Sequence, residues 1–309
     1  MKAVYDAPAP AKLNLFLHVI GRRDDGYHLL QSVFQLIDWC DTLHFERRGD
    51  ALLRRHDLGE SLPDDDLCLR AARALQQHSG TCCGVDISIE KHLPSGAGMG
   101  GGSSDAATTL LVLNRLWDLN WSRSRLAALA LSLGADVPFF VGGESAWVEG
   151  IGEQISPIAL PEQRFAVIKP AGSIATQRIF SSPLLKRDSD AAILAGYLER
   201  DQTSQLATGY GRNDLQPAAE AECDEVRQAC AWLYQRHGNS RMTGSGSAVF
   251  ARIASPASLV RDESEELLRV DIDARPEATT LPDLPAQWVG RECRGLQQHP
   301  LHGWAADGR

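Results

Sequence analysis

The chain has 309 residues, 43% of them hydrophobic and 23% charged, with a formal net charge of −9 at pH 7. This length predicts about two domains with a sizeable apolar core. The negative balance, with no stripe of arginines, argues against nucleic acid as the main partner. It leaves room for a small anionic substrate, which needs only one local positive site.

The seven cysteines are odd in number and no pair has a CxxC spacing. That usage predicts reduced thiols in a cytoplasmic protein. The N-terminal residues lack a long apolar stretch and no 18-residue apolar run occurs, so we expect no signal peptide and no membrane partner. We expect a monomer or a weak homodimer.

The first predicted elements are strands. Residues 11–21 alternate, with Leu13, Leu15, Leu17 and Val19 on one face and Lys12, Asn14, Phe16 and His18 on the other. Residues 31–48 predict a second strand with a bend near 38–41. A helix over 64–80 has an acidic first turn and ends at Gly80, and residues 84–94 predict another strand.

A glycine-rich run, "PSGAGMGGGSSDAA", then joins the strand to a helix over 103–119. Ser103 or Ser104 can cap this helix, and Asp105 suits its first turn. A glycine loop leading into a helix N-terminus lets free N–H groups surround an anion, and phosphate is the usual ligand. The alternative is a tight loop packed against another backbone segment.

Two other phosphate motifs fit less well. The run lacks the G-K-[ST] of a P-loop. Gly96, Gly98 and Gly101 satisfy G-x-G-x-x-G, but a dinucleotide fold needs a strand after the helix, and residues 122–136 predict another helix instead.

The second half predicts a strand near 144–153, a domain boundary near 154–163, and a strand over 164–170. A helix over 222–238, a glycine turn with a strand over 240–253, a helix over 255–270 and a last strand near 286–295 follow. The first two strands lack the helix that a parallel crossover requires. We therefore expect an α+β fold with mixed or antiparallel sheets, divided into domains 1–155 and 156–309.

The run from Pro94 to Ser104 resembles the ATP loop of the GHMP small-molecule kinases. Four further segments match the family in order: residues 10–19 ("PAKLNLFLHV"), 25–28 ("DGYH"), 133–140 ("LGADVPFF") and 243–251 ("TGSGSAVFA"). The resemblance implies a two-domain fold. Its N-terminal domain resembles the second domain of ribosomal protein S5, and its C-terminal domain is ferredoxin-like.

The resemblance implies transfer of the ATP γ-phosphoryl group, with Mg²⁺, to the 2-hydroxyl of a methylerythritol that carries cytidine diphosphate. This is a step of the non-mevalonate isoprenoid route. The alternatives are another kinase of the family, acting on homoserine, mevalonate or a sugar, or a non-catalytic nucleotide binder. The residues implied to bind ATP are Pro94, Ser95, Gly96, Ala97, Gly98, Met99, Gly100, Gly101, Gly102, Ser103 and Ser104. The sequence does not identify the Mg²⁺ ligands, and Ser104 is the one candidate that it offers.

The resemblance places the active-site lysine at Lys12, a substrate-binding asparagine at Asn14 and the catalytic base at Asp136. Taken alone, Lys12 suits a solvated edge of a strand. Asp136 suits a turn aspartate before Pro138 that follows a helix C-terminus, where the dipole disfavours a negative charge. In the functional interpretation, the charge of Lys12 compensates Asp136 and the forming alkoxide.

The resemblance also implies that Tyr27 stacks on the cytosine and His28 hydrogen-bonds it, with Phe180 on the other face of the base. Phe180 fits a core position equally well. The glycine turn at Gly244 and Gly246 suits either a hairpin or an anion-binding nest near the ATP phosphates. The cytosine contacts distinguish this substrate from those of the other kinases of the family.

Overall fold

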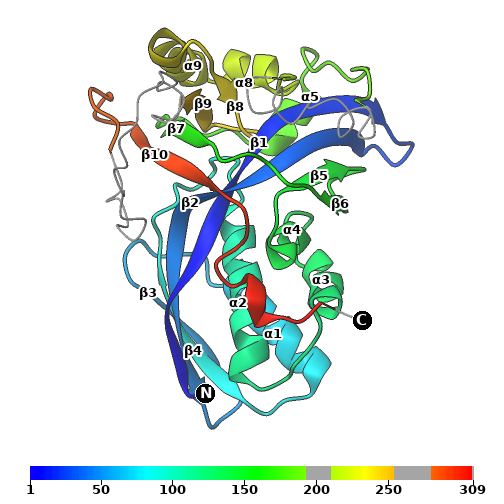
Figure 1. Cartoon of the computed structure of the whole chain (residues 1–309), viewed down its shortest axis with the longest axis vertical. Helices are drawn as coiled ribbons and strands as arrows, with labels where there is room; N and C mark the ends of the chain where they lie inside the picture. The colour runs from blue at the N-terminus through cyan, green and yellow to red at the C-terminus, as the bar shows by residue number, and fades with distance from the viewer. Residues whose placement is uncertain (193–209, 254–279, 308–309) are drawn as a thin grey trace, which may run out of the picture.

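The computed structural model describes residues 1–192, 210–253 and 280–307 (Figure 1). The expected α+β class is confirmed. The strands form one connected sheet in the order β3-β4-β2-β10-β7-β9-β8, with β1 and β5 also paired to β2 and β6 paired to β5. The β3–β4 pair is parallel and the other ladder pairs are antiparallel.

The described strands are β1 (Ala3–Arg22), β2 (His28–Arg48), β3 (Leu53–Asp57), β4 (Gly84–Glu90), β5 (Ala146–Glu149), β6 (Gln154–Pro157), β7 (Arg164–Lys169), β8 (Arg241–Met242), β9 (Val249–Ile253) and β10 (Val289–Leu296). The helices are α1 (Leu67–Ser79), α2 (Gly101–Leu116), α3 (Arg123–Leu131), α4 (Val137–Gly142), α5 (Thr176–Ser181), α8 (Gln216–Glu222), α9 (Asp224–His237) and the 3₁₀ turn η2 (His302–Trp304).

The β1–β2 hairpin runs through the whole molecule, and different stretches of β2 pair with β4, β5 and β10 (Figure 1). Its register shifts where Pro10 pairs with Cys40 and Ala11 pairs with Ile37, so two extra residues lie on β2. Such a bulge bends a strand and increases its twist. The bend expected near residues 38–41 is therefore present.

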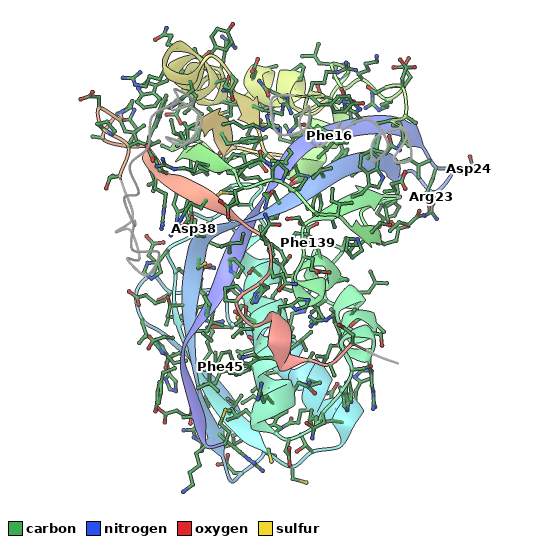
Figure 2. The ribbon with its side chains drawn as sticks, viewed as in Figure 1. Phe16, Arg23, Asp24, Asp38, Phe45 and Phe139 are labelled. Carbon is green, nitrogen blue, oxygen red and sulfur yellow. The ribbon has the colours of Figure 1, made fainter. Side chains whose placement is uncertain are left out.

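Helices cover the sheet at both ends. Phe45 of β2 is buried against the α1 and α2 layer in the lower half of Figure 2, and Phe16 of β1 lies in the upper half. Helix α9 packs on the upper strands through Val226, Ala229 and Leu233, and α8 packs there through Ala218 and Ala219. Arg23 and Asp24 lie at the hairpin tip, away from either core (Figure 2).

Interactions within the first and last turns determine where several of these helices begin and end. The Asp66 side chain accepts from the Leu69 N–H and begins α1, and Gly80 ends it at φ 70°. The expectation that Ser103 or Ser104 caps the next helix is wrong. Helix α2 already begins at Gly101, and its N-cap is Gly100, which has no side chain to offer.

The predicted helix over 255–270 lies outside the described residues. The predicted domain boundary at 155/156 falls inside β6 and stays a prediction. Among the described residues, no helix is long and apolar enough to cross a membrane.

Candidate active site

The glycine loop lies between β4 and α2 and needs its glycines for backbone geometry. Gly96, Gly98 and Gly100 have φ of 63°, 73° and 74°, which L-residues with a side chain rarely adopt. The loop lines a cavity of about 410 Å³ together with Leu62, Leu67 and Lys91. Because the first N–H groups of α2 have no partner within the helix, this cavity suits phosphate.

The same loop is also packed against another backbone segment, as the alternative interpretation expected, and phosphate binding by the loop stays a prediction. Ser247 N–H donates to the Gly96 carbonyl at 3.2 Å, and Ala248 N–H donates to the Ala97 carbonyl at 3.1 Å. A Cβ on Gly98 would lie 2.5 Å from the Thr243 carbonyl oxygen. The second glycine motif therefore supports the first through direct contact.

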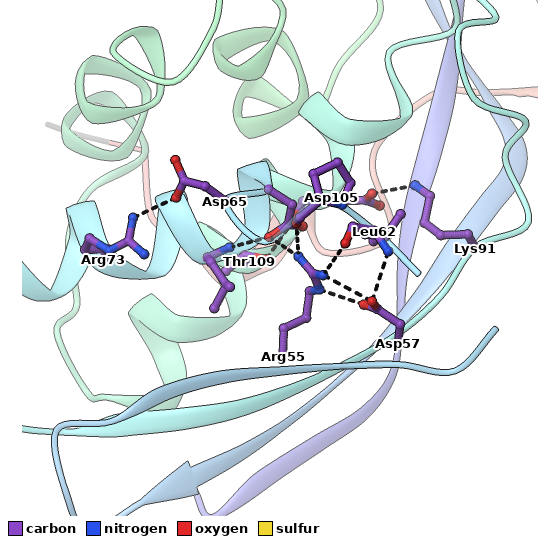
Figure 3. A network of polar contacts seen from close by, with 11 residues as sticks. Arg55, Asp57, Leu62, Asp65, Arg73, Lys91, Asp105 and Thr109 are labelled. Atoms are coloured by element: carbon purple, nitrogen blue, oxygen red, sulfur yellow. Dashed lines mark hydrogen bonds and ion pairs between the residues drawn. The ribbon is translucent and has the colours of Figure 1, made fainter. Parts of the chain in front are cut away.

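A buried charge cluster holds the far side of the loop. Lys91 Nζ donates to Asp41 and, at 2.6 Å, to Asp105 Oδ2 (Figure 3 shows Lys91 and Asp105). The other Asp41 oxygen accepts from the backbone N–H groups of His92 and Leu93. Burial raises the pKa of Asp105, against the opposing charge of Lys91. The cluster fastens the segment that enters the glycine loop.

A second network holds the opposite wall of that cavity. Arg55 of β3 forms ion pairs with Asp57 at 2.6 Å and with Asp66 at 2.9 Å, and it also donates to the Leu62 carbonyl (Figure 3). Leu62, Asp66 and Leu67 all line the glycine-loop cavity. Arg55 thus fixes the approach to α1 beside the loop.

Lys12 lies on β1 beside the loop and is only 4% exposed, so its interpretation as a solvated edge residue is wrong. Its ammonium donates to Asn14 Oδ1 at 2.5 Å and lies 4.4 Å from the centre of the Phe34 ring. Burial lowers the pKa of Lys12, and the charge of Asp136 opposes that effect. Asn14 is itself held by a 2.9 Å hydrogen bond to Ser32 Oγ.

Asp136 lies at the N-terminus of the six-residue α4. The expectation that it follows a helix C-terminus is wrong, so the helix end beside it carries partial positive rather than partial negative charge. Helix α3 has already ended at Leu131. The carboxylate is 34% exposed, and its Oδ2 lies 3.8 Å from Lys12 Nζ. Both side chains line a cavity of about 190 Å³ that also includes Gly98, Gly100 and Gly244.

The structure brings His28 and Phe180 together at the hairpin end. Their ring centres are 5.0 Å apart with planes 30° apart. Both line a cavity of about 710 Å³ with Tyr27, which is 61% exposed. Arg187 Nε donates to His28 Nε2 at 3.1 Å. Burial, then the charges of Arg187 and Arg22, lower the pKa of His28.

The three cavities have lining residues in common, so they adjoin one another, and together they are called the cleft. Gly98 and Gly100 line both the glycine-loop cavity and the Lys12–Asp136 cavity. Phe180 and Thr176 line both the Lys12–Asp136 cavity and the hairpin cavity. The order along the cleft is therefore phosphate loop, charged pair, then aromatic hairpin end.

Several residues of this cleft were missed in the sequence. Phe34 on β2 pairs with Asn14 and Ser32 pairs with Leu17, and only the strand register reveals that they lie beside the predicted site residues. Arg187 belongs to a stretch whose pattern predicts no element. Lys91 and Asp105 offered one signal, since opposite charges flank the glycine run at its two ends.

Metal ligands are sparse in this cleft. Within residues 1–192, 210–253 and 280–307, no group of three or more His, Cys, Asp or Glu side chains could hold a metal ion. Ser104 Oγ is buried beside the loop and has no hydrogen-bond partner in the part of the chain that the structure describes. One hydroxyl without a partner fits Mg²⁺ only if most of the ligands come from nucleotide oxygens.

Comparison with known proteins gives two family matches, "GHMP kinases N terminal domain" over residues 66–144 and "GHMP kinases C terminal" over residues 194–266. A 4-diphosphocytidyl-2-C-methyl-D-erythritol kinase of Methylibium petroleiphilum is 60% identical over 99% of each chain. One of a Polaromonas species is 54% identical over 98% of this chain and 95% of its own.

Solved structures agree on the fold. A crystal structure of 4-(cytidine 5'-diphospho)-2C-methyl-D-erythritol kinase is 34% identical, with a TM-score of 0.69 over 80% of this chain and 89% of its own. Homoserine kinase from Cytophaga hutchinsonii is 16% identical, with a TM-score of 0.59 over 83% of this chain and 86% of its own. At that identity the second likeness concerns the fold alone.

Proposed function

The chain belongs to the GHMP kinase family, and on that premise we propose that it transfers the γ-phosphoryl group of ATP to the 2-hydroxyl of 4-diphosphocytidyl-2-C-methyl-D-erythritol. The observation that carries the proposal is the single cleft, which joins a phosphate loop, a lysine–carboxylate pair and an aromatic end. A substrate that carries a pyrimidine nucleotide at one end and an alcohol at the other suits that order.

Each part of the cleft has a separate role in the proposed reaction. The loop from Pro94 to Ser104 binds the ATP phosphates through the free backbone N–H groups between its two ends. Asp136 takes the proton of the 2-hydroxyl, whose oxygen attacks the γ-phosphorus while the bond to the β–γ bridging oxygen breaks and ADP leaves. Lys12 supplies positive charge beside the attacking oxygen, and Asn14 holds Lys12 in place.

Mg²⁺ neutralises charge on the β- and γ-phosphate oxygens when it is bound. Ser104 Oγ fits as its protein ligand in this proposal, since that oxygen is buried without a partner among the described residues. Tyr27, His28 and Phe180 bind the cytosine. We further propose a cytoplasmic location, supported by seven unpaired cysteines. A monomer or weak homodimer stays a prediction.

The test is ADP release by purified protein with ATP, Mg²⁺ and a panel of alcohols. We expect turnover with the cytidine diphosphate substrate and little with free methylerythritol, because binding of a remote group helps to orient the reacting hydroxyl. Homoserine, mevalonate and galactose should be inactive. Faster turnover of any of these three than of the cytidine compound would contradict the proposal.

A further inference from the structure

The hydrogen bond between Arg187 and His28 can have only one of the two as its donor. A guanidinium group carries only donors and stays protonated at any physiological pH. The Arg187 Nε–H donates to His28 Nε2 at 3.1 Å, so Nε2 must be the unprotonated nitrogen. The two residues lie 159 positions apart in sequence, and only the fold brings them together.

The remaining donors of Arg187 hold it in that orientation. Its Nη1 donates to the Leu185 carbonyl at 3.1 Å, and its Nη2 donates to the carbonyls of Phe180 at 3.0 Å and Ser182 at 3.1 Å. A planar group held at several donors cannot rotate to offer His28 a different contact. The same side chain therefore positions the backbone of Phe180 and the ring of His28.

The contact determines what His28 offers to a ligand. A neutral imidazole carries one proton, so with Nε2 accepting from Arg187 the proton must be on Nδ1. Burial and the charges of Arg187 and Arg22 keep the ring neutral, since they lower the pKa of His28. Among the described residues Nδ1 has no hydrogen-bond partner, and the ring lines the 710 Å³ hairpin cavity.

We propose that Arg187 is a specificity-determining positioning residue, which fixes His28 as an Nδ1–H donor toward N3 of the base and so selects a pyrimidine whose N3 is an acceptor. This inference rests on the proposed function. Cytosine has an unprotonated N3, whereas uracil carries a proton there. A donor-only His28 hydrogen-bonds the first and meets a second donor in the other. With the opposite tautomer the preference would be reversed, so Arg187 controls it without touching the base.

The first test reads the tautomer directly and needs no substrate. The ¹⁵N spectrum of histidine-labelled protein, with His28 assigned through His28→Gln, should show Nδ1 protonated and Nε2 unprotonated in the wild type. Arg187→Gln should move both nitrogens toward averaged values. A wild-type spectrum with the proton on Nε2 would overturn the inference, whether or not any variant folds.

The second test measures kcat/KM for the cytidine substrate and its uridine analogue. Arg187→Gln should lower the cytidine-to-uridine ratio roughly three- to tenfold, which corresponds to one net hydrogen bond. Arg178→Gln is the matched control, because Arg178 is on the same helix as Phe180 and pairs with Glu222 instead. It should leave the ratio unchanged.

A double-mutant cycle separates action through His28 from a general effect on the pocket. In a His28→Ala background, Arg187→Gln should no longer change the ratio. An equal fall in that background, or an unchanged ratio in the single variant, would contradict the role of Arg187 and leave the kinase function intact. Absence of wild-type turnover with the cytidine compound would instead refute the proposed function, while the spectra still decide the tautomer.

Discussion

Two lysine–carboxylate groups flank the glycine loop, and they differ in almost every physical respect. Lys91 contacts both Asp41 and Asp105, and Asp41 also accepts from two backbone N–H groups. Lys12 lies 3.8 Å from Asp136, beyond a direct hydrogen bond, and donates to an amide instead. The Asp105 side chain is 4% exposed, whereas the Asp136 side chain is 34% exposed.

The pKa values of the two lysines are also shifted in opposite directions. Two nearby carboxylates raise the pKa of Lys91 despite its burial. Burial lowers the pKa of Lys12, because the single, more distant carboxylate does not offset it. In the Lys91 cluster the charges are already paired with one another, which suits a role in supporting the loop. The Lys12–Asp136 pair is looser and lines a cavity, so both of its charges stay available to a substrate.

Asp136→Asn should have the largest effect, on turnover rather than on stability. Loss of a general base lowers the rate by ~10²–10⁴. The carboxylate makes no hydrogen bond within the described residues, so the melting temperature should stay near that of the wild type. Steady-state kinetics and calorimetric ATP binding check this, with binding expected to persist. Near-normal turnover would show that Asp136 is not the base.

Lys91→Met should have the opposite profile. Two buried carboxylates would face each other without a cation, and breaking such a group costs about 3–5 kcal/mol of unfolding free energy. Urea unfolding at neutral pH measures the loss. Lys91→Met combined with Asp105→Asn is the matched control, and it should recover part of the stability because one of the two charges is gone. A Lys91→Met protein as stable as the wild type would remove the supporting role of the cluster.

Gly98→Ala and Gly101→Ala distinguish the two roles of the glycine loop. The first places a Cβ at φ 73° and 2.5 Å from the Thr243 carbonyl, so it should destabilise the fold by roughly 1–3 kcal/mol as well as weaken ATP binding. A Cβ on Gly101 would lie 3.4 Å from Leu93 in ordinary helical backbone, so its stability should stay close to that of the wild type. Thermal unfolding of both variants, measured together, checks the contrast, and equal losses would refute it.

The smallest effect expected is a shift in the pKa of Lys12. Its positive charge is lost as the pH rises through that pKa, so the alkaline limb of turnover should lie below the range of an ordinary lysine. Because the charge of Asp136 opposes the lowering, Asp136→Asn should lower the pKa further. A ¹⁵N titration of the five lysines reads this directly, with Lys91 as the internal control that stays above its ordinary value. An unchanged Lys12 pKa in Asp136→Asn would mean that the pair is not coupled.

Sequence reasoning succeeded at the end of α1, because the left-handed Gly80 acts on its own turn. It placed the start too early, since the helix expected over 64–80 with an acidic first turn begins at Leu67, with Asp66 as its cap and no acid in the first turn. It failed at the start of α2, since a glycine N-cap leaves no side-chain signal. The burial of Lys12 was likewise missed, because alternation of residues shows two faces but does not show that both are covered.

The order of motifs and the need for a flexible backbone before α2 were determined by the sequence itself, since only glycine adopts those dihedrals at no steric cost. Which charges meet was decided by the tertiary structure. Lys12 reaches Asp136, Lys91 reaches Asp41, and Arg187 reaches His28, all across long separations in the chain. Such contacts depend on strand register and helix placement, and burial then determines whether each charge supports the fold or stays open to a ligand.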